Sequence, residues 1–290
     1  MGIKDQGPTV FLAPLKTNTR ITPHHFLMSF HLPRIARSAS PGQFLMVSLG
    51  DHCDPLLPRP FAVYNIDGDC VEVLYRRVGK GTTLLADRRA GDVVRILGPL
   101  GRGFALGKDL AEGKDLADIR VVAGGTGIAS LYFLMKQSLQ RGVAVSLFYG
   151  AGSHREMLPL RELQSLGLRL HVVTEDGSIG YCGTVSDLFA SFLRDQAPRP
   201  SQRTHTFVCG PASMMAAVAD LLRHSDLPGQ FSLESRMACG YGACQGCVVE
   251  TTTMNERNEP TYQRVCTEGP VFTLGEIRWD RLVEGPARKR

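Results

Sequence analysis

The sequence predicts a multidomain protein that combines the α+β and α/β classes, with an antiparallel β-barrel, a Rossmann-like parallel sheet and a small C-terminal domain. Short stretches of strand composition, separated by Gly and Pro turns, fill the chain from about residue 9 to residue 99. From residue 119 onward strands alternate with helices, and four of the eight cysteines gather near the C-terminus. We therefore expect three domains, at residues 8–106, 118–226 and 227–290, which a chain of 290 residues is long enough to build.

The composition is that of an ordinary soluble globular protein, with 43% hydrophobic and 21% charged residues. No apolar run reaches about 18 residues, so we expect no membrane span. The N-terminal residues lack the apolar region of a secretory signal, and together with free cysteines this favours the cytoplasm. A net charge of +5, spread along the chain, does not indicate a nucleic-acid partner.

The first domain is predicted from stretches with the β-branched and aromatic composition of strands. These are Phe44–Leu49, Phe61–Ile66, Val71–Arg76 and Asp92–Leu97, separated by turn signals at Pro41-Gly42, Asp67-Gly68 and Ala90-Gly91. Several short strands at this spacing are typical of an antiparallel barrel. The polar stretch Gly107–Asp118 that follows is interpreted as a helical connector or surface loop at the domain boundary.

The second domain is predicted from the regular alternation of strands and helices, which implies βαβ units and a parallel sheet. The expected strands are Ile119–Ala123, Val143–Tyr149, Leu168–Thr174 and Thr206–Pro211. The expected helices are Ile128–Gln140, Leu158–Leu166, Thr184–Leu193 and Ala212–Arg223.

The third domain contains the most specific motif, C-x4-C-x2-C…C, which is formed by Cys239, Cys244, Cys247 and Cys266. This is the plant-type spacing for a [2Fe–2S] cluster, whose irons are held by thiolates. Zinc is one alternative, but structural zinc sites usually have two C-x2-C or Cys/His pairs, and only one is present. Disulfides are the other alternative, and they need an oxidising compartment. The spacing favours the cluster.

Two motifs in the first domain are candidates for ligand binding. R-P-F-A-V at Arg59–Val63 places an arginine on a strand beside an aromatic residue, although an ordinary strand with a solvated arginine has the same composition. G-K-G-T-T at Gly79–Thr83 follows a strand, and we expect a helix to begin at Thr82-Thr83. Glycines allow a ligand to approach the backbone, and a helix N-terminus offers free N–H groups to phosphate. A plain tight turn would have the same pattern.

Two further motifs lie in the second domain at the C-terminal ends of expected strands, where ligands bind in open α/β sheets. G-G-T-G at Gly124–Gly127 lies between a strand and a helix, which is the context of nucleotide binding or of a tight turn without a ligand. V-C-G-P at Val208–Pro211 would place Cys209 beside a nicotinamide, unless this cysteine is a buried packing residue.

Together these motifs resemble those of the ferredoxin–NADP reductase superfamily. R-P-F-A resembles its flavin motif, G-K-G-T its flavin-phosphate loop, and G-G-T-G-I with C-G-P-x-x-M its pyridine-nucleotide half. The cysteine string, followed by R-V-C-T-E-G-P-V-F, is similar to that of the electron-transfer subunits of type B dihydroorotate dehydrogenase. The resemblance extends from about Pro8 to Glu276, and it implies FAD, NAD and a [2Fe–2S] cluster as cofactors, with NADP left open.

The resemblance also implies roles for individual residues. Flavin binding is assigned to Arg59, Pro60, Phe61, Ala62, Val63, Gly79, Gly81, Thr82 and Thr83, and pyridine-nucleotide binding to Gly124, Gly125, Thr126 and Gly127. The cluster ligands are Cys239, Cys244, Cys247 and Cys266, and the catalytic positions are Ala62 and Cys209. Ala62 stands where the superfamily usually has a serine, so its side chain cannot donate a hydrogen bond toward flavin N5.

The implied function is electron transfer between NAD(H), FAD and the cluster, to or from a catalytic dehydrogenase subunit in a hetero-oligomer. Dihydroorotate dehydrogenase of pyrimidine biosynthesis is the favoured partner. The alternatives are a subunit of a sulfite reductase, hydrogenase or transhydrogenase complex, a non-enzymatic redox sensor and a zinc-stabilised binding module. Arg155 would favour the 2′-phosphate of NADP and Glu156 would oppose it, which leaves a weak preference for NAD.

Overall fold

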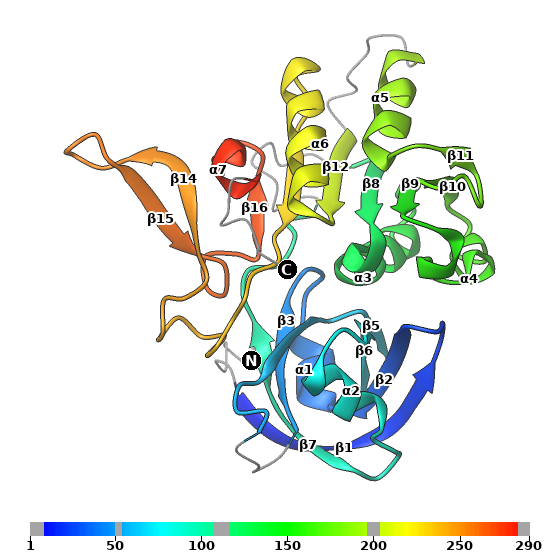
Figure 1. Cartoon of the computed structure of the whole chain (residues 1–290), viewed down its shortest axis with the longest axis vertical. Helices are drawn as coiled ribbons and strands as arrows, with labels where there is room; N and C mark the ends of the chain where they lie inside the picture. Colours follow the sequence, from blue (N-terminus) through cyan, green and yellow to red (C-terminus); the bar gives the residue numbers. More distant parts are fainter. Residues whose placement is uncertain (1–8, 50–53, 107–115, 196–203, 284–290) are drawn as a thin grey trace.

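The computed structural model describes residues 9–49, 54–106, 116–195 and 204–283, and it contains three parts (Figure 1). A curved antiparallel sheet forms the N-terminal part, a mostly parallel sheet flanked by helices forms the middle, and a cysteine-containing loop with a hairpin follows. Among the described residues, no helix has both the length and the apolar composition needed to cross a membrane. Most of the connector expected at 107–118, residue 8 of the first expected domain and residues 284–290 of the third lie outside the described residues.

The N-terminal sheet has the strand order β4-β3-β7-β1-β2-β6-β5, and every neighbouring pair is antiparallel. Its elements are β1 (Thr9–Arg20), β2 (His25–His31), α1 (Pro33–Ser38), β3 (Phe44–Ser48), β4 (Arg59–Ala62), β5 (Asn65–Asp67), β6 (Cys70–Arg76), α2 (Lys80–Ala86) and β7 (Val93–Leu100). The two edge strands, β4 and β5, are separated in sequence only by Val63 and Tyr64. The sheet must therefore curl until its edges approach each other, which confirms the predicted antiparallel barrel in the form of a curled, open sheet.

Two local predictions in this part are wrong, and three further elements were not individually predicted. The single strand expected at Phe61–Ile66 is two strands on opposite edges, and the chain crosses between them at Val63 and Tyr64. α2 begins at Lys80, two residues before the expected start, because the Thr82 hydroxyl bonds back to the preceding turn and caps the helix. The strand composition expected from about residue 9 gives no bounds for β1 or β2 and does not predict α1, and the internal proline of β1 weakens its strand signal.

The central sheet has the order β11-β10-β9-β8-β12-β13-β16, and it is parallel except for the pair β13–β16. Its strands up to β13 are β8 (Asp118–Gly124), β9 (Ala144–Ala151), β10 (Arg169–Thr174), β11 (Tyr181–Cys182), β12 (Thr204–Cys209) and β13 (Gly229–Ser232). The helical segments are η2 (Gly125–Gly127), α3 (Ile128–Gln140), η3 (His154–Glu156), α4 (Leu160–Gln164), α5 (Val185–Asp195) and α6 (Ala212–His224). This confirms the predicted parallel sheet.

The strand order of this sheet also locates its binding crevice. The chain runs outward from β8 through β9 to β10 and then returns to β12 on the other side of β8. The order therefore reverses between β8 and β12, and a crevice opens at the carboxyl ends of these two strands. Gly124 ends β8 and Cys209 ends β12, so the two motifs singled out in this domain meet at the crevice.

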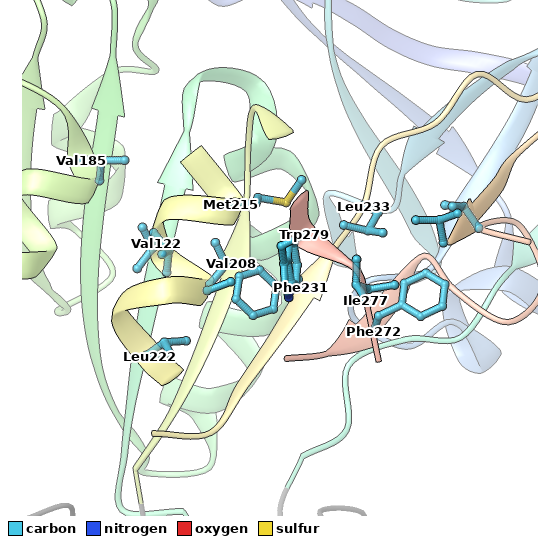
Figure 2. Close-up of a cluster of buried hydrophobic side chains, with 14 of the residues drawn as sticks. Val122, Val185, Val208, Met215, Leu222, Phe231, Leu233, Phe272, Ile277 and Trp279 are labelled. Atoms are coloured by element: carbon cyan, nitrogen blue, oxygen red, sulfur yellow. The ribbon is translucent and has the colours of Figure 1, made fainter. Parts of the chain in front are cut away.

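The C-terminal part contains the hairpin of β14 (Val248–Met254) and β15 (Pro260–Arg264), which projects away from the rest of the molecule (Figure 1). The short strand β16 (Val271–Thr273) then returns to the edge of the central sheet, and α7 (Trp279–Val283) follows. Figure 2 shows Phe272, Ile277 and Trp279 packed beside Phe231 of β13, so one core joins the central sheet to the C-terminal part. Two strands of the central sheet, β13 and β16, lie within residues 227–290, the range expected for the third domain. The expected division of domains at 226/227 stays a prediction.

The barrel and the central sheet meet along α3 and the turn after β8. The ring of Tyr64 stacks on that of Tyr132 in α3, with the centroids 4.3 Å apart. His25 of β2 is buried, and its Nε2 lies 3.3 Å from Oγ1 of Thr126. Burial lowers the pKa of His25 to about 4, so this imidazole is neutral at physiological pH and bonds without a charge. These contacts hold the two sheets together beside two cavities that residues of both sheets line.

Candidate functional site

A cavity of about 400 Å³ lies where the barrel, the turn after β8 and the C-terminal part meet. Its barrel side includes three residues of the predicted flavin strand, Pro60, Phe61 and Ala62. Other lining residues are Phe44 of β3, Leu74, Tyr75 and Arg76 of β6, and Met237 and Pro270 of the C-terminal part. Apolar walls with a few polar groups are suited to a planar aromatic ligand such as an isoalloxazine ring.

Arg59 and the start of α2 form a positively charged corner next to this cavity. A Cβ atom added at Gly81 would lie 2.5 Å from Cζ of Arg59, so the guanidinium packs directly against the first turn of the helix. Only a glycine allows this close approach. A fixed cation beside the N–H groups of a helix start is suited to a diphosphate, so the residues present fit the diphosphate of FAD.

The Thr82 hydroxyl makes its hydrogen bonds within the turn that precedes α2. It accepts hydrogen bonds from the backbone N–H groups of Val78 at 2.9 Å and Gly79 at 3.1 Å, and it donates to the Gly79 carbonyl at 3.0 Å. The side chain of Thr83 points outward and is exposed. Thr82 therefore shapes the loop, while the Arg59 guanidinium, the loop backbone and the exposed Thr83 hydroxyl can meet a phosphate, so the predicted role of Thr83 stays a prediction.

A second cavity, of about 820 Å³, occupies the crevice between β8 and β12. All four residues of the predicted nucleotide turn line it, namely Gly124, Gly125, Thr126 and Gly127. A Cβ atom at Gly127 would lie 2.6 Å from the carbonyl carbon of Cys209, so this glycine lets the turn after β8 pack on the end of β12. Gly125 has a φ of +54°, which favours glycine, and nothing lies within 4 Å of its Cβ position. The open backbone at Gly125 fits a dinucleotide.

The two cavities share three lining residues, Arg76, Thr126 and Glu234. Nη2 of Arg76 pairs with Oε1 of Glu156 at 2.9 Å across the boundary between barrel and central sheet. Although part of its side chain faces the open cavities, burial raises the pKa of the Glu234 carboxyl. The ligands of the two cavities would therefore meet at a shared wall that carries the Glu234 carboxyl group.

Cys209 and Val63 lie behind the cavity walls and do not line them. The Cys209 thiol bonds Ser130 and Ser232, which do line the flavin cavity. Burial, with the nearby charge of Glu234, raises the pKa of Cys209 to about 12, so the thiol stays protonated. Its catalytic role stays a prediction, and from this position the thiol would act through the two serines.

The four predicted cluster ligands lie in two touching pairs. The backbone N–H of Cys244 donates to Sγ of Cys239 at 3.4 Å, and the thiol of Cys247 bonds that of Cys266. The charge of Cys239 also acts on Cys266, so the two pairs are neighbours. A [2Fe–2S] cluster takes four thiolates, two on each iron, and this arrangement fits it. In the part of the chain that the structure describes, no three His, Cys, Asp or Glu side chains are grouped to hold a single metal ion.

The environments of these thiols differ in their effect on ionisation. At Cys239 burial opposes ionisation, but the N–H groups of Cys244, Tyr241 and Ala243 lower the pKa to about 6. Burial and the neighbouring Cys247 raise the pKa of Cys266 to about 12. Because an iron ligand must be a thiolate, the hydrogen bonds to Cys239 favour its ligand form, while cluster assembly would have to remove the proton that burial favours on Cys266.

The cysteine loop packs on the flavin barrel. A Cβ atom at Gly240 would lie 2.7 Å from Sδ of Met46 in β3, two residues after Phe44 of the flavin cavity. Met237 and Pro270, which flank the cysteine motif in sequence, line the same cavity. The cysteine loop therefore packs on β3, whose first residue, Phe44, lines the flavin cavity.

Several residues of the site have little or no signal in the sequence. Tyr75 and Arg76 end β6 shortly before the G-K-G-T segment, and that position could have identified them. Glu234 follows β13, and only its place after a sheet strand points to the crevice. Met237 and Pro270 reach the flavin cavity through tertiary folding, which no local pattern encodes.

Comparisons with known proteins agree with this geometry. A family model for the iron–sulfur cluster binding domain of dihydroorotate dehydrogenase B matches residues 234–278, and one for the oxidoreductase NAD-binding domain matches residues 121–220. The dihydroorotate dehydrogenase B (NAD(+)) electron transfer subunit of Desulforamulus reducens is 36% identical over 273 residues, which cover 93% of this chain and 99% of that protein. The subunit of the same name from Bacillus caldolyticus is 39% identical over 240 residues, which cover 82% and 86%.

Solved structures share the fold. A chain of the NADH-dependent reduced ferredoxin-NADP oxidoreductase, studied for flavin-based electron bifurcation, has a TM-score of 0.79 and 25% identity over 94% of this chain and 92% of that one. A ferredoxin NADP+ reductase from Neisseria gonorrhoeae with bound FAD and NADP has a TM-score of 0.63 and 19% identity over 74% and 91%.

The barrel, the nucleotide sheet and the four-cysteine loop define an oxidoreductase of the ferredoxin–NADP reductase type with an iron–sulfur domain. Its cofactors are FAD, NAD and a [2Fe–2S] cluster. The chain belongs to the family of dihydroorotate dehydrogenase B electron transfer subunits.

Proposed function

We propose that this chain passes electrons between NAD(H), FAD and the [2Fe–2S] cluster and exchanges them with a catalytic dihydroorotate dehydrogenase subunit. The proposal rests on one observation: the flavin cavity shares wall residues with the nucleotide cavity and is also lined by the cysteine-containing part. Arg76, Thr126 and Glu234 line both large cavities, and Met237 and Pro270 bring the cysteine-containing part to the flavin cavity. When bound, NAD(H) carries a hydride, FAD converts electron pairs into single electrons, and the cluster carries single electrons.

The residues of the chain have distinct tasks in this proposal. Arg59, with the loop before α2, holds the flavin diphosphate, and Phe61 and Tyr75 orient the ring system. Ala62 leaves the flavin edge without a side-chain donor, so only backbone groups of the strand can bond it there. Glu234 places a carboxyl group where the two cavities meet, and desolvation raises the pKa of that group.

The face around the cysteine loop is proposed to contact the catalytic subunit. Cys244 is exposed, and the exposed fractions of Tyr241, Val248 and Tyr262 are 56%, 49% and 58%. These residues lie on the cysteine loop and on the hairpin that projects from the molecule (Figure 1). Aromatic and aliphatic side chains at the edge of a redox site are suited to a protein partner. We place the complex in the cytoplasm, which suits the free thiols of the described cysteines.

Coexpression with a dihydroorotate dehydrogenase catalytic subunit tests the proposal. We expect the two chains to copurify, and dihydroorotate to reduce NAD+ only when both are present. The control is each chain alone with the same substrates. Copurified chains that bind FAD and the cluster but show no transfer from dihydroorotate to NAD+ would contradict the proposed partner and leave the cofactor path standing.

Glu175 is proposed to select NAD over NADP. Three carboxylates line the end of the nucleotide cavity formed by β9, β10 and α5. Glu156 pairs with Arg76, and Asp187 accepts a hydrogen bond from the Thr184 hydroxyl at 2.7 Å, which caps α5. Among the described residues this leaves the Glu175 carboxylate to face the adenosine ribose, where it would repel a 2′-phosphate.

Replacing Glu175 by Gln is therefore expected to raise the ratio of kcat/KM for NADPH to that for NADH by about tenfold, since about 1.4 kcal/mol of repulsion is removed. Steady-state reduction of ferricyanide by each nucleotide measures this ratio. Glu162→Gln, an exposed carboxylate of α4 outside the cavity, is the matched control. An unchanged ratio in Glu175→Gln would mean that another group reads the ribose.

A further inference from the structure

The Arg264 side chain connects the segments that carry the cluster ligands. Arg264 ends β15, two residues before Cys266, and lies opposite Val248 in the β14–β15 register. Val248 directly follows Cys247, so Arg264 lies beside two ligand positions. Its Nη1 then reaches the third segment and donates to the Gly242 carbonyl at 3.3 Å.

Glu268 holds this guanidinium in one orientation. Its carboxylate accepts hydrogen bonds from Nε of Arg264 at 3.1 Å and from Nη2 at 2.5 Å, which is a two-point contact. The same carboxylate accepts the backbone N–H of Arg264 at 2.7 Å and the Thr267 hydroxyl at 2.9 Å. A carboxylate with four donors and a forked arginine cannot rotate without breaking several bonds at once.

The pair closes the turn that contains Cys266. The carbonyl of Arg264 accepts the N–H groups of Thr267 at 3.2 Å and Glu268 at 3.0 Å. The loop that carries Cys239, Cys244 and Cys247 is also constrained, because Gly242 has a φ of +86°. A Cβ atom at Gly242 would lie 2.9 Å from Cγ2 of Thr267 and 3.2 Å from Nη1 of Arg264. The Cys239–Cys247 loop therefore packs on Arg264 and on the turn that contains Cys266.

We propose that Arg264, held by Glu268, is a positioning residue that keeps the Cys239–Cys247 loop and the Cys266 turn at the spacing required by the cluster. Arg264 donates to the loop backbone, so it acts on the cluster through the loop. The inference rests on the cluster of the proposed function, but it is independent of the partner and of the substrate. Groups that orient metal ligands in this way typically contribute about 10- to 100-fold to metal affinity.

Iron release from the purified holoprotein tests this role without any measurement of turnover. The rate of iron transfer to a ferrous chelator under reducing conditions is compared for wild type, Arg264→Lys, Arg264→Met and Glu268→Gln. We expect Arg264→Met and Glu268→Gln to release iron about 10- to 100-fold faster, with an altered visible circular dichroism spectrum. Arg264→Lys keeps the charge but loses the fork, and it is expected to release iron faster than wild type as well.

Arg278→Met is the matched control, because Arg278 pairs with Glu250 at 3.2 Å and Asp280 at 3.0 Å in the same part of the chain. It should release iron at the wild-type rate. FAD content reports whether each variant has folded, and Glu268→Gln tests the role if Arg264→Met does not fold. A wild-type rate in Arg264→Lys would overturn positioning by the fork, and wild-type rates in all three variants would overturn the role altogether. A wild-type protein without iron would instead contradict the proposed function.

Discussion

Serine at position 244 is expected to remove the iron–sulfur cluster and to leave the flavin half of the protein working. A serine hydroxyl is a hard, protonated group at neutral pH, whereas iron in these clusters is held by soft thiolates. Cys244 is exposed, so the change leaves the packing of the loop intact. Iron and acid-labile sulfide should be lost, while FAD content and NADH-driven ferricyanide reduction stay at wild-type values.

The same variant separates the cluster from the rest of the electron path. In complex with the catalytic subunit, NAD+ reduction by dihydroorotate should fall to background, because the proposed electron path between the flavin and that subunit runs through the cluster. Cys182→Ser is the matched control, since Cys182 is also an exposed free cysteine but lies on β11. A full cluster spectrum in Cys244→Ser would show that the ligand set is assigned incorrectly.

The cluster site could be predicted from the sequence because its ligands are defined by spacing. Three of the four cysteines lie within nine residues, and glycines between them allow the loop to turn. The nucleotide sheet was predictable for a similar reason, since each strand–turn–helix unit is local and α3 lies at the expected residues Ile128–Gln140. Local patterns therefore identify the parts of this protein in which the chemistry depends on neighbours in sequence.

The flavin cavity was only partly predictable because it is built from distant segments. The strand expected at Phe61–Ile66 is broken by a crossing between the two sheet edges, which alternation of side chains cannot reveal. Met237 and Pro270 join the wall only when the C-terminal part folds back on the barrel. Glu234 lies in no sequence motif, and only the fold places it beside both cavities, where desolvation raises the pKa of its carboxyl group.

Alanine at position 81 is expected to weaken FAD binding without destabilising the fold. Alanine is a better helix former than glycine by up to about 1 kcal/mol, so α2 should not suffer. The new Cβ would overlap the end of the Arg59 side chain, which is flexible enough to move away. A displaced guanidinium loses hydrogen bonds to the diphosphate worth about 1.5–3 kcal/mol, and FAD should bind about 10- to 100-fold more weakly.

Titration of the apoprotein with FAD, followed by flavin fluorescence, measures this loss, and thermal unfolding checks that the fold is intact. Gly275→Ala is the matched control, since nothing lies within 4 Å of its Cβ position.

A double-mutant cycle with Arg59→Ala decides how the Gly81 substitution acts. If the methyl group works by displacing the guanidinium, Gly81→Ala should cost nothing further once Arg59 is alanine, because the displaced group is already absent. If the two losses add, the methyl group meets the ligand itself and the role of Arg59 as the group it displaces is contradicted. The cycle thus tests whether the arginine of the R-P-F-A strand and the glycine of the G-K-G-T loop, which lie 22 positions apart, form one diphosphate site.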